Sequence, residues 1–462
     1  MLKIVKRVSE EDRISELPVH IIHHILCHTD LDLQEAARSC ILSKRWYYCW
    51  TSRPNLIFGR FQGKKIMPLE NYVKLVDQSL RSYVEQNLHL EQLNLTYRDP
   101  ELDSHVDTWI ELAVKLNVRV LGIYASFLRS YSLPDVINDA KKLTKLRLKT
   151  CKFEFDISTT HIRFDCLEDL YLDHVHISDA QWQRIIERSP FIRTLTLYAC
   201  QGIKKLQVCG LVHLENLIVE WCKFDSVIVQ VPNLQCFKYE EHAVYPCKIV
   251  ILDGYNTLQT LELMGASITE QQFRDVSYKF PNISELNLTL CIQLKNIEIQ
   301  SEKLKKFTLV QMESLEKVTI QAPNLLEFDF KGDKVPFSSM DPSSLERSQL
   351  NFISLSTNFG SVDSSWYTNL HHFVQKFNYS KGLILAIFCR KVLSILKECT
   401  QKQNCGRECP FNTEYFHRHS ILKDVISCPY CPCTGVTEEG MTSIWYSWLK
   451  STPLTVTNFM LK

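Results

Sequence analysis

The sequence predicts an α/β fold in which a small three-helix unit precedes a curved solenoid with a parallel sheet. Three observations support this prediction. An apolar pair recurs every 20 to 28 residues, a longer register of 91 residues links distant segments, and the first fifty residues hold three short amphipathic stretches. At 462 residues, with 45% hydrophobic and 23% charged side chains, the chain has enough apolar material for an elongated core.

The recurring unit is a pair of apolar residues spaced by two, with a leucine three residues upstream, as in LEQLNL (90–95) and LEDLYL (167–172). A period of roughly 20 to 29 residues is typical of leucine-rich repeats, in which each unit adds one short parallel strand. Unrelated buried strands would not keep this spacing, so about twelve units are expected between residues 88 and 357. The first members of the pairs are Leu93, Leu121, Leu146, Leu170, Leu195, Leu217, Phe237, Leu261, Leu286, Phe307, Phe328 and Ile353.

The 91-residue register relates VIVQVPNLQCFKY (227–239) to VTIQAPNLLEFDF (318–330), which match at six of thirteen positions. Capping boxes that begin at Ser178 and Thr269 repeat at the same offset and predict helices on the convex side. Units of 20 to 22 residues have no room for a helix, and their second short apolar alternation predicts strands there. The alternating pairs are Leu206/Val208, Val227/Val229, Ile297/Ile299 and Val318/Ile320.

Residues that alternate with the buried pairs are expected to face the concave surface of the solenoid. The candidate target-binding residues on this surface are Lys145, Arg147, Lys149, Tyr171 and Tyr198. The basic trio permits an anion site, but Asp169 would lie opposite Lys145 and Asp173 opposite Lys149 in parallel register. Solvated cross-strand ion pairs are therefore the favoured interpretation.

Three helices are expected in the first fifty residues. Pro18 opens the first at its first position, and Asp32 caps a second whose apolar stripe runs from Leu33 to Ile41. Ser43 caps the third, on which Cys49 and Trp50 turn inward. Helices this short bury too little surface to be stable alone, so they need a partner or must pack on the first repeat as a cap.

The segments DRISELPVHIIHHIL (12–26) and ILSKRWYYCWTSRPNLIF (41–58) resemble the F-box of plant F-box/leucine-rich-repeat proteins, and HRHSILKDV (417–425) is similar to a segment near the C-terminus of such proteins. CHTDLDLQEAARS (27–39) departs from the usual Pro-containing turn of the family. The resemblance implies an F-box at 10–57, a helical linker at 58–87, leucine-rich repeats at 88–357, and a C-terminal region at 358–462 with a last repeat-like strand and a Cys-rich tail.

Such proteins are substrate receptors of Skp-cullin-F-box ubiquitin ligases. The resemblance implies that the F-box binds a Skp-type adaptor, and through it a cullin, while the repeats hold an unknown protein substrate. The alternative is a repeat scaffold without ligase activity. The adaptor contacts that the resemblance implies are Leu17, Pro18, Ile21, Ile22, Ile25, Leu42, Ser43, Lys44, Arg45 and Trp46.

The Cys-rich tail allows a further alternative. Cys428 and Cys431 have the two-residue gap of a zinc knuckle, and Cys405 and Cys409 could supply a second pair. The gaps are irregular, so a loop of incidental thiols is favoured and no metal or cofactor is expected. Most other cysteines lie singly in apolar segments, where free thiols are typical.

Several function classes are excluded at this level. The net charge of +1 gives no general drive toward nucleic acid, and no apolar run is long enough for a signal peptide or a membrane span. We therefore expect an intracellular protein of the cytoplasm or nucleus. Nucleotide-binding loops, metalloprotease motifs and nucleophile elbows are missing from the sequence, so we expect no catalytic residues and no enzyme activity.

Overall fold

The computed structural model divides the chain into two compact units, Met1–Phe224 and Asp225–Lys462, each of which is described by itself. The whole Cys-rich tail, with all four candidate zinc ligands and the HRHSILKDV segment, lies outside the described residues. The described residues are 14, 16–27, 37–62, 65–126, 129–154, 162–241, 247–251, 256–271, 273–274, 280–332, 334–353, 373, 376 and 383–388.

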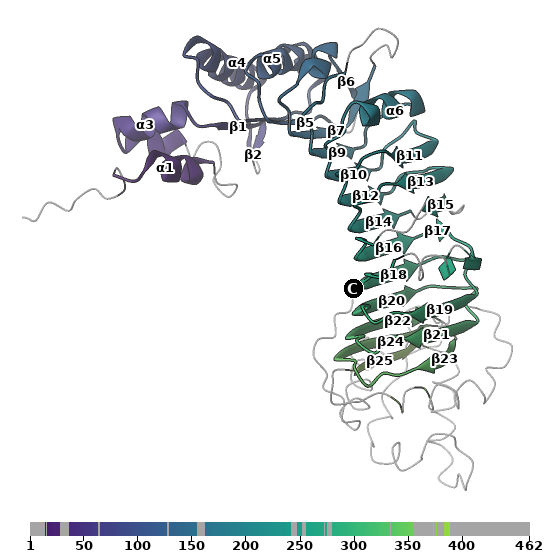
Figure 1. Ribbon diagram of the computed structural model, residues 1–462. Helices are drawn as coiled ribbons and strands as arrows, with labels where there is room; N and C mark the ends of the chain where they lie inside the picture. The colour runs from purple at the N-terminus through teal and green to yellow at the C-terminus, as the bar shows by residue number, and fades with distance from the viewer. Residues whose placement is uncertain are drawn as a thin grey trace, which may run out of the picture. The chain divides into compact units, whose positions relative to one another are not determined.

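The first unit begins with the helices α1 (Val19–Leu26) and α3 (Lys44–Thr51), drawn in purple in Figure 1. Pro18 is the N-cap of α1 rather than its first residue. Ser43 caps α3 as expected, its side chain accepting a hydrogen bond from the Trp46 backbone at 3.3 Å. The expected second helix lies largely outside the described residues and ends in the 3₁₀ turn η1 (Ser39–Ile41).

The 3.6-residue period predicted that Ile41 belongs to a buried stripe, but the structure exposes this residue. Its side chain is 87% exposed. The reason is the change from α-helical to 3₁₀ geometry at Ser39, which rotates later residues away from the face that the α-helical period defines. The core of the helical unit is instead made by Ile22, Leu26, Trp46 and Cys49.

The main sheet of the first unit is parallel throughout, and each apolar pair aligns with the pair of the next strand, for example Leu146 with Leu170. The inward residues of these pairs are almost completely buried, which confirms the repeat prediction. In order across the sheet, the strands are β1 (Asn55–Gly59), β4 (Gln92–Thr96), β5 (Val120–Tyr124), β7 (Lys145–Lys149), β9 (Asp169–Asp173), β10 (Thr194–Tyr198) and β12 (Asn216–Glu220).

The sheet starts earlier than residue 88, where the repeats were expected to begin. Strand β1 pairs with β4, and its Leu56 and Phe58 are fully buried. This strand escaped the pattern because Arg53 stands where the upstream leucine would be. The expected linker at 58–87 consequently contains the end of β1, the short antiparallel pair β2 (Phe61–Gln62) and β3 (Lys65–Ile66), and the helix α4 (Leu69–Glu85).

Helices lie beside the longer coils of the first unit. The helix α5 (Asp103–Lys115) follows β4, and α6 (Asp179–Glu187) follows β9. Both bonds of the predicted capping box at the start of α6 are present: Gln181 N donates to the Ser178 side chain, and Ser178 N donates to the Gln181 side chain. Trp182 of α6 is buried and donates to the Gln207 carbonyl at 2.9 Å.

The second unit is a stack of parallel strands, drawn in teal and green in Figure 1. The four predicted secondary alternations all form strands: one in the first unit, β11 (Lys205–Cys209), and three in the second. The second-unit side sheets are β13 (Ser226–Gln230), β15 (Cys247–Ile251) and β17 (Ala266–Ser267), and then β19 (Asn296–Gln300), β21 (Lys317–Gln321) and β23 (Phe337–Met340). Its main sheet holds β14 (Cys236–Glu240), β16 (Thr260–Met264), β18 (Glu285–Thr289), β20 (Lys306–Val310), β22 (Glu327–Gly332), β24 (Arg347–Ile353) and β25 (Leu383–Phe388).

The last predicted unit is out of register. Phe328 of β22 aligns with Ser348, not with Ile353, and Phe330 aligns with Leu350. The buried Ser348 occupies the position that is apolar in the other strands. Because a serine gives no hydrophobic signal, the sequence pattern placed the start of this pair at Ile353, five residues after its actual position. Strand β25 pairs with β24 and lies in the C-terminal region 358–462, where one last repeat-like strand was expected.

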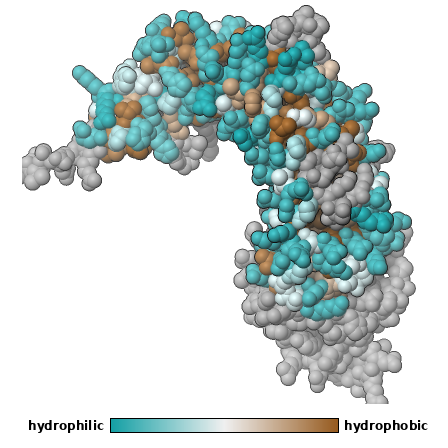
Figure 2. Space-filling view, viewed as in Figure 1, coloured by the Kyte–Doolittle hydropathy of each residue, from teal (hydrophilic) through white to brown (hydrophobic). Residues whose placement is uncertain are grey.

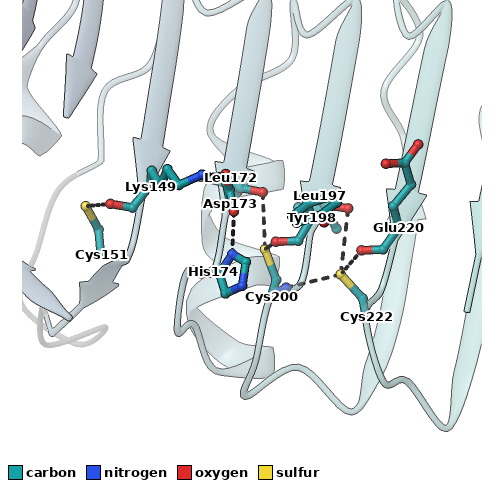
Figure 3. Close-up of polar contacts among 10 residues, drawn as sticks. All are labelled: Lys149, Cys151, Leu172, Asp173, His174, Leu197, Tyr198, Cys200, Glu220 and Cys222. Atoms are coloured by element: carbon teal, nitrogen blue, oxygen red, sulfur yellow. Dashed lines mark hydrogen bonds and ion pairs between the residues drawn. The ribbon is translucent and has the colours of Figure 1, made fainter. Parts of the chain in front are cut away.

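A cysteine recurs just after the main-sheet strands. Residues with positive φ, Thr150, Ala199, Trp221 and Leu290, follow β7, β10, β12 and β18, and each is followed by a buried cysteine. The left-handed residue turns the chain inward, and each thiol reaches backbone carbonyls of its own coil and of the preceding one. Figure 3 draws both contacts for Cys200 and Cys222. The cysteines are Cys151, Cys200, Cys222 and Cys291. They are thus hydrogen-bonding groups as well as small apolar ones.

Cys222→Ala should destabilise the protein more than the loss of one small side chain suggests. The Cys222 sulfur accepts a hydrogen bond from the buried Cys200 backbone N–H at 3.2 Å, and alanine would leave that donor without its acceptor, at a cost of about 1–3 kcal/mol. Cys222→Ser retains an acceptor and should recover much of this loss. Urea denaturation followed by circular dichroism measures both variants, and equal stabilities for them would contradict the role of the sulfur.

Candidate functional site

The helical unit carries an unusual number of exposed apolar side chains for its size. Figure 2 shows hydrophobic residues at its surface. The exposed fractions are 37% for Ile21 and 53% for Leu42, and both aromatic rings at 47 and 48 are more than half exposed. We define the exposed apolar set as Val19, Ile21, Ile41, Leu42, Tyr47 and Tyr48. Apolar residues left in water by a folded unit are typical of a surface that binds another protein.

The ten predicted adaptor contacts do not all share this surface. Pro18, Ile21, Leu42 and Lys44 are exposed, while Leu17, Ile25, Ser43 and Arg45 are half-buried. Ile22 and Trp46 are core residues with 0% and 3% exposure, so they lie beneath the outer surface of the helical unit. These two side chains pack together between α1 and α3, and the apolar pattern alone does not distinguish that inner position from the outer face.

Ile41, Tyr47 and Tyr48 were not among the predicted contacts. The sequence held a signal for the tyrosines, because positions 47 and 48 lie between the inward positions 46, 49 and 50 of α3. Ile41 had no comparable signal, since its exposure depends on the 3₁₀ turn.

A buried arginine joins the helical unit to the first coil. The Arg53 guanidinium donates to the Trp50 carbonyl at 2.6 Å and lies 3.6 Å from the centre of the Trp50 ring. The Tyr83 hydroxyl of α4 donates to the Arg53 carbonyl. Burial lowers the pKa of Arg53, with the neighbouring phenol and thiols acting in the opposite direction. These contacts hold the end of α3 against α4, so the exposed apolar set rests on an anchored base.

The second candidate surface is the outward face of β7, β9 and β10, which we call the repeat face. Lys145 and Arg147 are exposed on it, while Lys149, Tyr171 and Tyr198 are half-buried. The register places Arg147 beside Tyr171, and Tyr171 beside Thr196. All five predicted residues therefore lie on neighbouring strands.

The basic residues of the repeat face are largely paired with acids. Lys149 Nζ lies 2.7 Å from Asp173 Oδ2, and the other oxygen of Asp173 lies 2.5 Å from His174 Nδ1 (Figure 3). Lys145 lies opposite Asp169 in the parallel register, as predicted. The ion pair of Asp169, however, is made with Arg147 at 3.3 Å and not with Lys145. The longer arginine side chain crosses diagonally. Local compensation, not an open anion site, thus characterises this face.

Burial affects the acid–base behaviour of several thiols and phenols. Burial raises the pKa of Cys291 to about 12, and burial raises the pKa of Tyr83 to about 12 despite the opposing charge of Arg53. Every described cysteine is a free thiol. Within the described part of the chain, no group of three or more His, Cys, Asp or Glu side chains is arranged to hold a metal ion.

These pKa values predict a loss of stability at high pH. The folded state keeps the protons of Cys291 and Tyr83, whereas the unfolded chain releases them near 9.0 and 10.0. The stabilisation is complete below pH 9.0 and is lost as the pH rises toward about 12, by roughly 1.4 kcal/mol per pH unit for each group. Urea titrations at a series of pH values test this, and Cys291→Ala should flatten the first part of the decline. An unchanged slope in that variant would contradict the assignment to Cys291.

The repeats match a known family. Residues 80–250 and 246–362, more than half of the chain together, match the family model described as "At1g61320/AtMIF1, LRR domain". Three similar proteins of Arabidopsis thaliana carry related names. F-box/LRR-repeat protein 25 is 28% identical over 47% of this chain and 78% of its own length. Putative F-box/LRR-repeat protein At3g18150 is 25% identical over 66% and 58%, and F-box/LRR-repeat protein At5g02910 is 27% identical over 52% and 50%.

The chain belongs to the plant F-box/leucine-rich-repeat family. The chain matches 58% and 50% of the length of the last two relatives, so family membership by itself does not assign partners or targets to this F-box/leucine-rich-repeat protein. None of the helices among its described residues combines the length and the apolar character that crossing a bilayer requires.

Proposed function

We propose that this protein is a non-catalytic substrate receptor of a ubiquitin ligase, in which the helical unit binds a Skp-type adaptor and the repeats hold the target protein. The observation that carries the proposal is the exposed apolar set on the helical unit, at the segment that resembles an F-box. The similarity to proteins named F-box/LRR-repeat supports the same assignment. Through the adaptor, a cullin would bring the ubiquitin-loaded enzyme close to the target.

The chemistry of the exposed apolar set suits a protein partner. Ile21 and Leu42 offer aliphatic anchors, Tyr47 adds an aromatic one, and Lys44 and Arg45 lie beside them in the sequence as orienting charges. Interfaces of this kind combine a few desolvated apolar anchors with a polar rim. A receptor of this type acts by proximity and needs no active site, because it raises the local concentration of target lysines.

The repeat face suits target recognition. It presents paired charges, as between Lys149 and Asp173, together with half-buried tyrosine rings at 171 and 198. Paired charges are less costly to cover than lone ones, and tyrosines are common anchors of protein interfaces. We therefore propose that the target binds to the repeat face. We also propose that this binding takes place inside the cell, in the cytoplasm or the nucleus.

The test is a binding measurement between the purified chain and a purified plant Skp-type adaptor. The proposal predicts a one-to-one complex that elutes as a single species and resists dilution to micromolar concentrations. If the folded chain and the adaptor elute separately at every ratio, the ligase assignment is wrong, and a repeat scaffold without ligase activity becomes the better explanation.

A further inference from the structure

A pocket rich in basic side chains lies beside α6 in the first unit, outside both candidate surfaces. Its volume is about 440 Å³. Three segments of consecutive coils contribute to it: the turn before β7, the loop before β9, and the second half of α6 with its C-cap. The lining residues are Lys141, Ile162, Arg163, Asp165, Arg184 and Arg188.

The charge of this pocket is not compensated. Four cationic side chains line it, against the single carboxylate of Asp165. Elsewhere, cations on neighbouring coils meet acids, as Arg193 meets Glu215 at 2.8 Å and Lys238 meets Glu262 at 2.8 Å. Within the described part of the chain, the four pocket cations have no such acid partner. The end of α6 adds a partial negative charge near Arg188, which is smaller than the excess of cations.

Arg184 is the residue that most needs a ligand. Its Nε is shielded from solvent and has no hydrogen-bond partner among the described residues. A buried N–H of a charged group without an acceptor is unfavourable, and an anionic oxygen that entered the pocket could accept from it. Arg163, Arg188 and Lys141 are exposed, so their charged ends are free to reach the same anion.

The repeat architecture does not require these charges. At the 91-residue offset, the framework residue Trp182 corresponds to Phe273, which is also buried. Arg184 corresponds to Asp275, a residue of opposite charge. The basic pocket is therefore a property of the first module rather than of the repeat.

We propose that this pocket binds a phosphate monoester, carried either by a phosphorylated side chain or by a small molecule. A monoester carries nearly two negative charges and three acceptor oxygens near neutral pH, which several convergent guanidinium groups match. Arginine forks bind phosphate oxygens in pairs. A nucleic-acid backbone is a poorer match, because it spreads single charges along an extended track and this chain has a net charge of only +1.

The test uses the full chain and calorimetric titration at constant ionic strength with four probes. The probes are inorganic phosphate, a phosphoserine peptide, the same peptide without phosphate, and a single-stranded DNA oligonucleotide. Arg184→Gln with Arg188→Gln should weaken binding of the phosphoserine peptide or of inorganic phosphate by roughly tenfold or more. Lys295→Gln with Lys306→Gln is the matched control, because it removes one exposed and one half-buried cation that both lie outside the pocket, and affinity should not change.

Tighter binding of the phosphopeptide than of inorganic phosphate identifies a phosphorylated protein as the source, and the reverse order identifies a small molecule. Arg184→Lys should retain part of the affinity, because it keeps the charge and loses the fork. The proposal is overturned if neither the phosphoserine peptide nor inorganic phosphate binds, if the pocket variant binds them as the wild type does, or if the oligonucleotide binds more tightly than both. Circular dichroism of each variant confirms that it is folded.

Discussion

Trp109→Ala should lower the free energy of unfolding by about 3–5 kcal/mol, the largest stability effect that we expect from a single substitution in this chain. Trp109 of α5 is fully buried, and its indole N–H donates to Asp77 of α4 at 2.7 Å. Its ring also meets that of Tyr72 edge to face, with centroids 5.9 Å apart. Alanine would leave a large cavity between two helices and deprive Asp77 of its donor.

Trp221→Ala is the matched control for this substitution. Trp221 is 47% exposed, and its positive φ is as unfavourable for alanine as for tryptophan, so the change should cost about 1 kcal/mol or less. Urea denaturation followed by circular dichroism compares the two variants without relying on tryptophan fluorescence. Equal losses in both would show that Trp109 does not hold α5 against α4.

Ile21→Ala combined with Leu42→Ala should weaken adaptor binding by roughly 100-fold, because each truncation of an apolar anchor at a protein interface costs about 1.4 kcal/mol or more. Both side chains are exposed, so the double variant should keep the stability of the wild type. Truncating Leu17 would be less informative, because this side chain packs against the core of the helical unit and its loss would also lower stability. Calorimetric titration with the adaptor gives the two dissociation constants.

The control for the double variant removes exposed apolar side chains from the repeats. Val212→Ala with Ile292→Ala truncates residues that are 48% and 38% exposed, and adaptor affinity should not change. Two results would contradict the assignment of the interface: the F-box variant binding the adaptor as tightly as the wild type, or the repeat variant losing affinity instead.

The repeated strands were predictable because each unit carries the same local signal, and burial of one apolar pair per strand determines the register. The prediction failed where a unit lacks that signal. Upstream of β1 an arginine at 53 stands where the leucine would be, and in β24 a serine at 348 replaces the apolar residue. The sequence predicted that the cysteines are buried free thiols but not that they contact backbone carbonyls, because these contacts depend on the positive-φ residue before each cysteine.

The candidate surfaces were less predictable than the fold. Ile22 and Ile21 are neighbours of the same chemical type, yet one is core and the other is exposed, because only packing against α3 decides which face of α1 is inward. The basic pocket had no sequence signal at all. Lys141, Arg163 and Arg184 are separated by about twenty residues each, and only the stacking of coils brings them together.

Hydrogen–deuterium exchange of the full chain, with and without the Skp-type adaptor, tests the central claim most directly. The proposed function predicts that adaptor binding protects backbone amides of α1, η1 and α3, where the exposed apolar set lies, and leaves exchange unchanged in β7, β9 and β10 of the repeat face. Protection confined to the repeats, or no protection at saturating adaptor, would contradict the account of this protein as a substrate receptor with a free recognition face.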